Sequence, residues 1–524
     1  MDWTFPYPSQ RVPVFARNVV ATSQPLAAQA GLDAMRRGGN AIDAALASAI
    51  ALTVVEPTMN GIGSDAFALV WDGQTLQGLN SSGRSPRAWT REHFDRYSEM
   101  PRQGWDCVTT PGCVAAWVEL SDRFGALAFR DLFDAAIAYA ESGFAVSPIT
   151  AQVWNYCAEY YKSFEGFQST FIFNGRAPRA GEVVHLPDHA RSLEDIAVTQ
   201  GESFYRGDLA RRISQYAADS GGLLGAQDLA AHTADWVEPM GVDLGEYRLH
   251  EIPPNGQGLA ALIALGVLQR TSIATSAVDS ADSLHLQLEA MKIGIAEAAT
   301  HIADRDSMRV EPEALLRAEV LDQHAERIEL GRAKKHASLL PSSPDTVYLT
   351  AADADGRMVS YIQSNFFAFG SGIVVPGTGI ALQNRGSGFS LERGHPNEVG
   401  PGKRPFHTII PGFVTRGDQP VMSFGVMGGP MQPQGHVQVM VRVFVYDQNP
   451  QAAADAPRWQ VLGDGRVALE PGFAPDVIED LETRGHRIET ANPAAMGGAQ
   501  LVYRLEDGYC AASDPRKDGQ AVGF

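Results

Sequence analysis

One hydroxyl residue, Thr346, opens a predicted strand directly after a connector that cannot hold a regular element. The connector, residues 337–345 (ASLLPSSPD), is rich in serine and proline and is expected to lie exposed. If the 345/346 bond were cut, Thr346 would carry both a hydroxyl and an α-amine. The ordinary pKa of an α-amine, about 7.7 to 8.0, suits a base near neutrality. Threonine is common in strands, so position alone is weak evidence for a nucleophile.

The same hydroxyl could make the cut itself. Attack of Thr346 on the carbonyl of Asp345 would shift the acyl group from nitrogen to oxygen, and water would then hydrolyse the ester. The predicted cleavage site is therefore the bond between Asp345 and Thr346.

A glycine pair and an arginine could complete a catalytic site. Gly428 and Gly429, within VMGGP, could direct two backbone N–H groups at a developing oxyanion, although a simple turn fits the same letters. Arg84 lies in the polar loop NSSGRSP, where its guanidinium could bind a carboxylate. Taken alone, a solvated surface arginine explains that loop equally well.

Metal and nucleotide chemistry lack support in the sequence. His407 and His436 lie in apolar or glycine-rich settings typical of packed core histidines, and no HExxH pattern is present. The GxGxxG and GxxxxGK[ST] phosphate-binding patterns are missing. The four cysteines have no metal-type spacing and are expected to be reduced. We therefore expect no metal and no cofactor.

Composition limits the partners. The chain has 524 residues, is 44% hydrophobic and 20% charged, and carries a net charge of −19. Such a charge opposes binding to nucleic acid or anionic lipid. No secretory signal and no run of roughly 20 apolar residues is present, so a cytoplasmic enzyme is expected.

Periodicity and turn residues predict the elements that must position these residues. Ser23 is expected to cap the first helix and Asn40 the second, and Asp72-Gly73 and residues 353–356 are expected to form hairpin turns. The patterns predict helices over 23–37, 41–54, 129–143, 283–302 and 311–335, and strands over 66–71, 346–351, 358–364, 372–382 and 408–415.

Several of these segments together resemble the γ-glutamyltransferase family, from about residue 20 to residue 458. The segments are GGNAIDAA at 38–45, EP at 56–57, GIG at 61–63, DT at 345–346, FGSG at 369–372, VGPGKRP at 399–405, GG at 428–429 and DAPR at 455–458.

The resemblance implies an α+β fold, the four-layer αββα sandwich of N-terminal nucleophile (Ntn) hydrolases. It also implies self-cleavage into a large subunit, residues 1–345, and a small subunit, residues 346–524, which form one catalytic heterodimer; whether heterodimers pair further stays open. The implied site residues are Thr346 as nucleophile, Ser364 as a second hydroxyl, Gly428 and Gly429 as the oxyanion hole, Arg84 as the carboxylate ligand and, more loosely, Asn365.

The departures from the family pattern concern substrate. Gly388 stands where typical members have the acid that binds the α-ammonium of a γ-glutamyl group, Arg385 stands for a glutamine, and His407-Thr408 replaces a serine pair. Loss of a charge-assisted contact costs about 1.5 to 3 kcal/mol, and Arg385 would repel an ammonium further. We therefore expect a small carboxylate-bearing amide, oxamate-like or glutaryl-type, and expect Gly388→Asp to shift preference toward γ-glutamyl amides.

Two alternatives stay open. The chain could be a γ-glutamyl hydrolase or transpeptidase acting on glutathione, with Glu392 as the ammonium ligand. It could also be an uncleaved, inactive binding protein of the same fold. Hydrolysis is favoured over transfer because the loop between Ser390 and Val399, which forms a lid in the family, is short.

Overall fold

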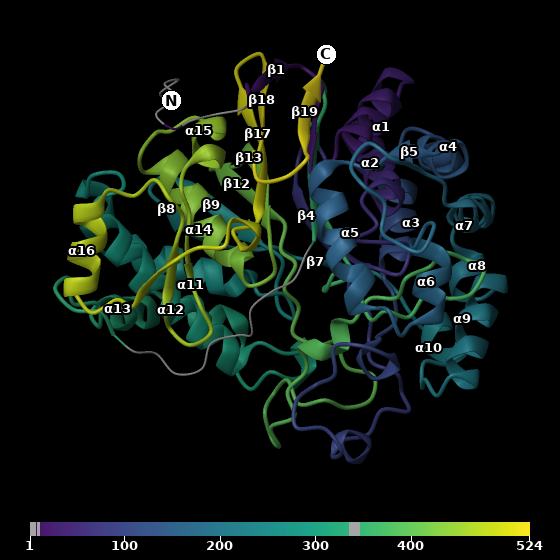
Figure 1. Cartoon of the computed structure of the whole chain (residues 1–524). Coiled ribbons are helices and arrows are strands. Elements are labelled where there is room, and N and C mark those ends of the chain that lie inside the picture. The colour runs from purple at the N-terminus through teal and green to yellow at the C-terminus, as the bar shows by residue number, and fades with distance from the viewer. Residues whose placement is uncertain (1–6, 8–10, 335–345) are drawn as a thin grey trace.

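Two seven-stranded sheets form the centre of the molecule, and helices cover the outer face of each (Figure 1). The computed structural model describes residue 7, residues 11–334 and residues 346–524. All neighbouring strands within the two sheets are antiparallel. The four layers confirm the αββα sandwich expected from the sequence.

The first sheet carries the threonine candidate. Its strands, in spatial order, are β19 (Gln520–Gly523), β2 (Val19–Thr22), β10 (Val347–Ala352), β11 (Met358–Ser364), β3 (Asp65–Trp71), β4 (Leu76–Ser81) and β7 (Asp235–Val237). The second sheet has the order β1 (Val14–Ala16), β18 (Gly508–Ser513), β17 (Gly498–Leu505), β13 (Gln419–Met427), β12 (Gly412–Arg416), β9 (Tyr247–Glu251) and β8 (Met240–Leu244).

Apolar side chains fill three interfaces. Residues such as Phe67, Tyr348 and Phe413 pack between the two sheets. Helices α1 (Pro25–Arg36), α2 (Ala41–Val55) and α3 (Cys113–Phe124) cover the first sheet, and α11 (Gly258–Leu268), α12 (Ala281–His301) and α14 (Met431–Phe444) cover the second. Every residue of α2 is buried, as expected for a helix that is apolar all round.

The remaining elements lie around these layers. They are α4 (Asp134–Ser142), α5 (Pro148–Tyr160), α6 (Glu165–Phe171), α7 (Pro187–Thr199), α8 (Glu202–Tyr205), α9 (Asp208–Asp219), α10 (Ala226–Ala230), α13 (Ala318–Ala325), α15 (Pro450–Asp455), α16 (Pro475–Thr483), β5 (Phe144–Ala145), β6 (Val183–Val184), β14 (Trp459–Val461), β15 (Val467–Leu469) and β16 (Ile488–Thr490). No helix within the described ranges is long and apolar enough to cross a bilayer.

Most predicted elements near the site are confirmed. Asn40 caps α2 by accepting from two backbone N–H groups, and both hairpins, β3–β4 and β10–β11, are present. Ser23, in contrast, does not cap α1. The side chain of Gln24 does, because the Ser23 hydroxyl donates to Glu56 Oε2 over 2.5 Å.

Three predicted elements are wrong or shortened. The helix expected over 311–335 is reduced to α13, because Arg317 has extended backbone and separates α13 from a 3₁₀ turn at Pro312–Leu316. Residues 372–382 form no strand and contribute two isolated bridges, one between Val374 and Ala381 and one between Leu382 and Gly63. The strand expected at 408–415 begins only at Gly412. The predicted connector, 337–345, lies outside the described residues.

Candidate functional site

Thr346 lies directly before β10, and only 1% of its surface is exposed. Its Oγ1 donates a hydrogen bond to Ser364 Oγ over 3.2 Å, and Gln432 Nε2 donates one to Thr346 Oγ1 over 3.4 Å. The threonine hydroxyl is thus fixed by side chains from β11 and α14. Asp345, the other half of the predicted cleavage site, lies outside the described residues.

Arg385 is fully buried and binds the same serine. Its Nη2 donates to Ser364 Oγ over 3.1 Å, and its Nη1 donates to Thr408 Oγ1 over 2.7 Å. The guanidinium carbon lies 4.3 Å from the ring centre of Phe366. Its Nε has no hydrogen-bond partner among the described residues, and burial lowers the pKa of Arg385 to about 9. A desolvated cation therefore lies one hydrogen bond from the hydroxyl that orients Thr346.

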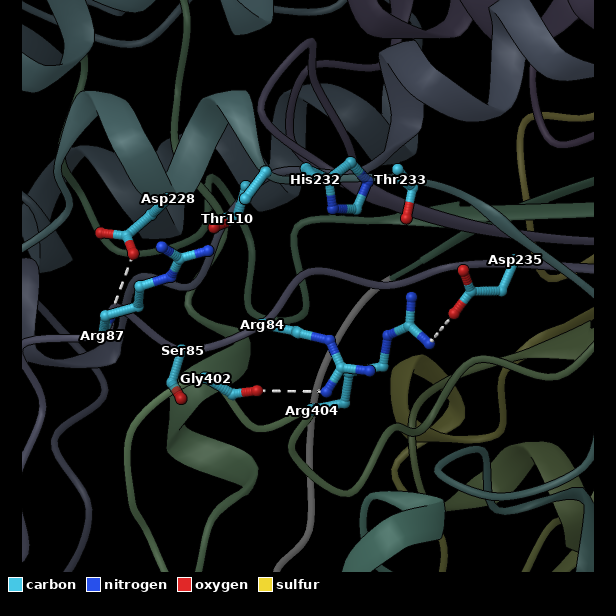
Figure 2. A pocket seen from close by; sticks show the side chains of 11 residues that line it. Arg84, Ser85, Arg87, Thr110, Asp228, His232, Thr233, Asp235, Gly402 and Arg404 are labelled. Carbon is cyan, nitrogen blue, oxygen red and sulfur yellow. Dashed lines mark hydrogen bonds and ion pairs between the residues drawn. The ribbon is translucent and has the colours of Figure 1, made fainter.

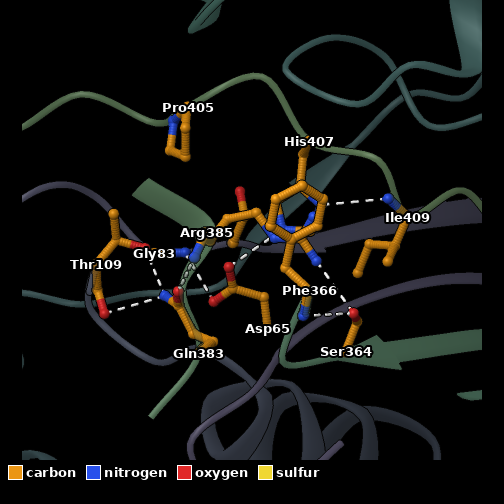
Figure 3. A network of polar contacts seen from close by, with 12 residues as sticks. Asp65, Gly83, Thr109, Ser364, Phe366, Gln383, Arg385, Pro405, His407 and Ile409 are labelled. Atoms are coloured by element: carbon orange, nitrogen blue, oxygen red, sulfur yellow. Dashed lines mark hydrogen bonds and ion pairs between the residues drawn. The ribbon is translucent and has the colours of Figure 1, made fainter. Parts of the chain in front are cut away.

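His407, the neighbour of Thr408, is a hydrogen-bond donor inside the core (Figure 3). Ile409 N donates to its Nδ1 over 3.3 Å, so the proton lies on Nε2, which faces Asp65 Oδ2 at 3.1 Å. Burial, with Arg385 and Arg404 nearby, lowers the pKa of His407 well below its usual range. The side chain is therefore neutral and suits a structural role better than that of a base.

Gly428 and Gly429 join β13 to α14. Both have positive φ, 115° and 55°, and a Cβ on Gly428 would lie 2.9 Å from Gly497 Cα. Neither backbone N–H donates a hydrogen bond to another residue in the described ranges. Because Gln432, in the first turn of α14, contacts Thr346, this helix N-terminus lies beside the hydroxyl. Two unengaged amides at a helix N-terminus suit a negatively charged oxygen.

Asn365 follows Ser364 and lies in the same cluster. Its Oδ1 accepts from Ser64 Oγ over 2.9 Å, while its buried Nδ2 has no partner among the described side chains and backbone groups. Phe366 has a φ of 76°, which is uncommon for a phenylalanine, and its N–H donates to Ser364 Oγ over 2.8 Å. The chain after Asn365 thus turns back on the serine.

Arg84 lies in a separate cavity (Figure 2). Its Nη1 donates to Asp304 Oδ2 over 2.7 Å and to Gly402 O over 3.1 Å. Within the described structure it makes no contact with the hydroxyls of Thr346 and Ser364. The cavity, of about 260 Å³, is lined by Arg84, Ser85, Arg87, Thr110, Asp228, Ala231, His232, Thr233, Asp235, Gly402 and Arg404.

Gly388 is held by close backbone packing. A Cβ built on it would lie 2.5 Å from Phe406 O. The Gly388→Asp exchange, expected from the sequence to install an ammonium site, would therefore displace the backbone instead.

A second cavity, of about 340 Å³, is lined by Ser387 and Phe389, the two neighbours of Gly388. Phe366 belongs both to its wall and to the contact with Arg385. The lining residues are Ser98, Glu99, Met100, Arg102, Phe366, Phe367, Asn384, Ser387, Phe389, Leu391 and Glu392.

Metal ligands do not gather in the described part of the chain. No three histidine, cysteine, aspartate or glutamate side chains there lie together as a metal ion would require. No disulfide joins the four cysteines, which are all buried.

A four-layer αββα sandwich with a hydroxyl residue at the start of a central strand defines the Ntn hydrolase class. The family profile described as Gamma-glutamyltranspeptidase matches residues 27–524, so the chain belongs to the gamma-glutamyltranspeptidase family of hydrolases and acylases.

Relatives named for several different activities match nearly the whole chain. The glutathione hydrolase-like YwrD proenzyme of Bacillus subtilis (strain 168) is 35% identical over 97% of this chain and 98% of its own. The oxamate amidohydrolase proenzyme of Klebsiella pneumoniae is 35% identical over 95% and 97%. The crystal structure of cephalosporin acylase from Bacillus halodurans has a TM-score of 0.94 at 46% identity and covers 100% of this chain and 99% of that one.

Sequence reasoning missed two residues of the cluster. Gln432 follows the glycine pair within one helical turn, and a helix start after Gly-Gly-Pro would have placed it beside Thr346. Asp65 opens a strand directly after Gly63-Ser64, and a carboxylate at the start of a buried strand is an unusual residue that could have drawn notice.

Proposed function

We propose that this chain is a self-processing amidohydrolase with Thr346 as its nucleophile, and that it cleaves small amides whose acyl group carries a carboxylate. Self-cleavage would yield residues 1–345 and 346–524, which stay together because the two sheets contain strands from both pieces. The proenzyme names of two relatives support this maturation.

The observation that carries the substrate class is the buried charge of Arg385. Its guanidinium is desolvated, lies one hydrogen bond from the serine that orients Thr346, and keeps one N–H without a partner. Burying a cation without a direct ion pair is costly, and an anionic acyl group would offset that cost. We therefore assign the carboxylate contact to Arg385, with Thr408 beside it. A carboxylate contact at Arg84, in its separate cavity, remains a prediction.

In the proposed reaction the α-amine of cleaved Thr346 takes the hydroxyl proton as Oγ1 attacks the amide carbon. The amides of Gly428 and Gly429 donate to the resulting oxyanion. The carbon–nitrogen bond then breaks, the amine passes the proton to the leaving nitrogen, and an acyl ester remains on Thr346. Water, deprotonated by the same amine, hydrolyses the ester and frees the carboxylic acid.

Hydrolysis assays on purified, matured protein test this assignment. Ammonia release from oxamate and from glutaramate should exceed turnover of γ-glutamyl-p-nitroanilide, which carries an α-ammonium. The neutral diamide oxamide should be a poorer substrate than oxamate, because it lacks the carboxylate for Arg385. Efficient γ-glutamyl turnover at micromolar substrate with none of oxamate would refute the proposal.

One observation favours γ-glutamyl hydrolysis as the second candidate. Glu99 and Glu392 both line the cavity of about 340 Å³ that shares Phe366 with the arginine site. Either carboxylate could receive an ammonium there, as expected for Glu392 from the sequence. Loss of γ-glutamyl turnover in Glu99→Gln or Glu392→Gln, with oxamate turnover retained, would support this candidate.

The inactive binding protein remains the alternative from another class. Denaturing electrophoresis of the purified wild type separates it from the proposal, because a single full-length band would show that the 345/346 bond stays intact.

A further inference from the structure

Asp65 and Ser364 (Figure 3) form the last cross-strand pair of the β3–β11 ladder, where β3 begins and β11 ends. Both residues are fully buried. An aspartate at a buried strand end is unusual, because ionised carboxylates are costly to desolvate. Its position next to the serine that Thr346 and Arg385 both contact points to a role in the site.

Hydrogen bonds fix the carboxylate. Gly83 N donates to Asp65 Oδ1 over 3.2 Å, and His407 Nε2 donates to Oδ2 over 3.1 Å. The histidine is held in this tautomer because its Nδ1 accepts from Ile409 N over 3.3 Å. Donors therefore surround Asp65 from two loops, and its orientation is set before any substrate arrives.

The charge of Asp65 acts on Arg385 through space. Arg385 hydrogen-bonds to two hydroxyls, and no carboxylate among the described residues lies within ion-pair distance of it. Asp65 nevertheless favours its charged form. Because both groups are buried, their interaction is little screened by solvent.

We infer that Asp65 is a positioning and specificity-determining residue. Its negative charge offsets the positive charge of Arg385, and it opposes the binding of an anionic acyl group until Asp65 takes up a proton. This inference rests on the proposed function. The cation, the aspartate and a bound carboxylate would together leave one uncompensated negative charge in a buried site, and protonation of Asp65 removes it. Anion binding and proton uptake should therefore be linked.

The surroundings of Asp65 support this linkage. Burial raises the pKa of Asp65 to about 7, while Arg385, Arg404 and the N–H groups of Gly83 and Gly112 oppose the increase. A carboxylate on Arg385 would cancel part of that opposition and raise the pKa further. The other titratable groups that interact with Asp65 are His407, Cys113 and Tyr205. Burial lowers the pKa of His407 and raises the pKa of Cys113 and of Tyr205, so all three are held in their neutral forms.

Calorimetry with oxalate, which lacks an amide bond and cannot be hydrolysed, tests the inference. Titrations of matured wild type at pH 7, in two buffers that differ in ionisation enthalpy, report the protons taken up per oxalate bound. We expect an uptake of up to about half a proton for wild type, because a group with a pKa near 7 is half protonated there. We expect a clearly smaller uptake for Asp65→Asn, which keeps the hydrogen-bond acceptor for His407 but cannot take up a proton itself.

Asp43→Asn is the matched control. Asp43 is also fully buried and accepts backbone hydrogen bonds. It belongs to the capping box in the first turn of α2, however, and its exchange should leave proton uptake unchanged. Oxalate affinity should rise up to about tenfold between pH 8 and pH 6 through Asp65 in wild type and in this control, and should rise less in Asp65→Asn.

Each outcome decides the inference. Binding without proton uptake by wild type, equal uptake by Asp65→Asn, or no oxalate binding at all would overturn it, and the wild-type measurement does so even if the variant fails to fold. Oxamate hydrolysis is assayed in parallel. Oxalate binding with linked proton uptake but no turnover of any amide would refute the proposed function and leave the role of Asp65 standing.

Discussion

The hydroxyl of Thr346 donates to that of Ser364 over 3.2 Å, from the start of one strand to the end of its hairpin partner. The hairpin thus sets the orientation of the threonine before any cleavage.

Thr346→Ala should give a single, stably folded chain without amidase activity, because no hydroxyl remains to attack the 345/346 bond. Thr346→Ser should still be cleaved, more slowly. Electrophoresis of samples taken over hours after purification measures both. An alanine variant cut at the same bond would show that another group makes the cut.

Ser364→Ala should slow cleavage of the 345/346 bond and should reduce kcat for amide hydrolysis, each by about tenfold to a hundredfold. The buried N–H groups of Arg385 and Phe366 would lose their acceptor, which costs about 1 to 3 kcal/mol, and Thr346 would lose its orienting contact. Ser360→Ala is the matched control, since Ser360 lies on the same strand and is hydrogen-bonded to Tyr348 instead. Equal effects of the two variants on kcat would contradict this role.

Arg385→Gln should raise KM for oxamate by roughly tenfold to a hundredfold, the equivalent of one charge-assisted contact. KM for the neutral oxamide should change little. Arg84→Met provides the comparison, because Arg84 lines the other cavity. If Arg84→Met raises KM for oxamate and Arg385→Gln does not, the carboxylate ligand is the one expected from sequence resemblance.

Gly428→Ala should reduce kcat by about 10² to 10³, as loss of an oxyanion donor does. Residue 428 has a positive φ, which alanine rarely adopts, and a Cβ there would contact Gly497, so the amide must move. Gly73→Ala is the control. Its φ of 106° is similar but nothing lies within 4 Å, so it should affect stability alone. Unchanged kcat in a folded Gly428→Ala variant would exclude this amide from the oxyanion hole.

Acid should loosen the contact between the two pieces at His486. Lys292 donates to its Nδ1 over 3.3 Å, and its Nε2 lies 2.9 Å from Nδ1 of His285, so it is neutral. Burial, with Lys292 and His285, lowers the pKa of His486 from 6.5 to about 3. A depressed folded-state pKa stabilises the protein above pH 6.5, and that contribution is lost as the pH falls toward 3.

Urea unfolding of the wild type between pH 7 and about pH 4 should therefore show a steeper loss of stability than that of His486→Gln. His185→Gln, at an exposed histidine, should follow the wild type. Identical pH dependence in all three proteins would contradict the assigned role of His486.

Local sequence determined the parts of the fold that depend on near neighbours. Asn40 is followed by an unbroken apolar helix, and the turn residues after Trp71 and Ala352 close two hairpins, so α2 and both strand pairs could be predicted. The helix expected over 311–335 and the strand over 372–382 failed because charge and apolar patterns do not reveal where extended residues interrupt an element, as Arg317 does.

For the site, the sequence by itself determined which groups are candidates for reaction. A threonine after a serine- and proline-rich connector, a glycine pair and an unexpected Arg385 supply a candidate nucleophile, candidate amide donors and a cation, because these properties belong to the residue types. Only the tertiary structure decided which of them meet. Arg385 lies beside Ser364, while Arg84 lies in another cavity. Asp65 reaches the same site because it pairs with Ser364, 299 residues away in the sequence. Sheet assembly creates this contact, and no local pattern contains it.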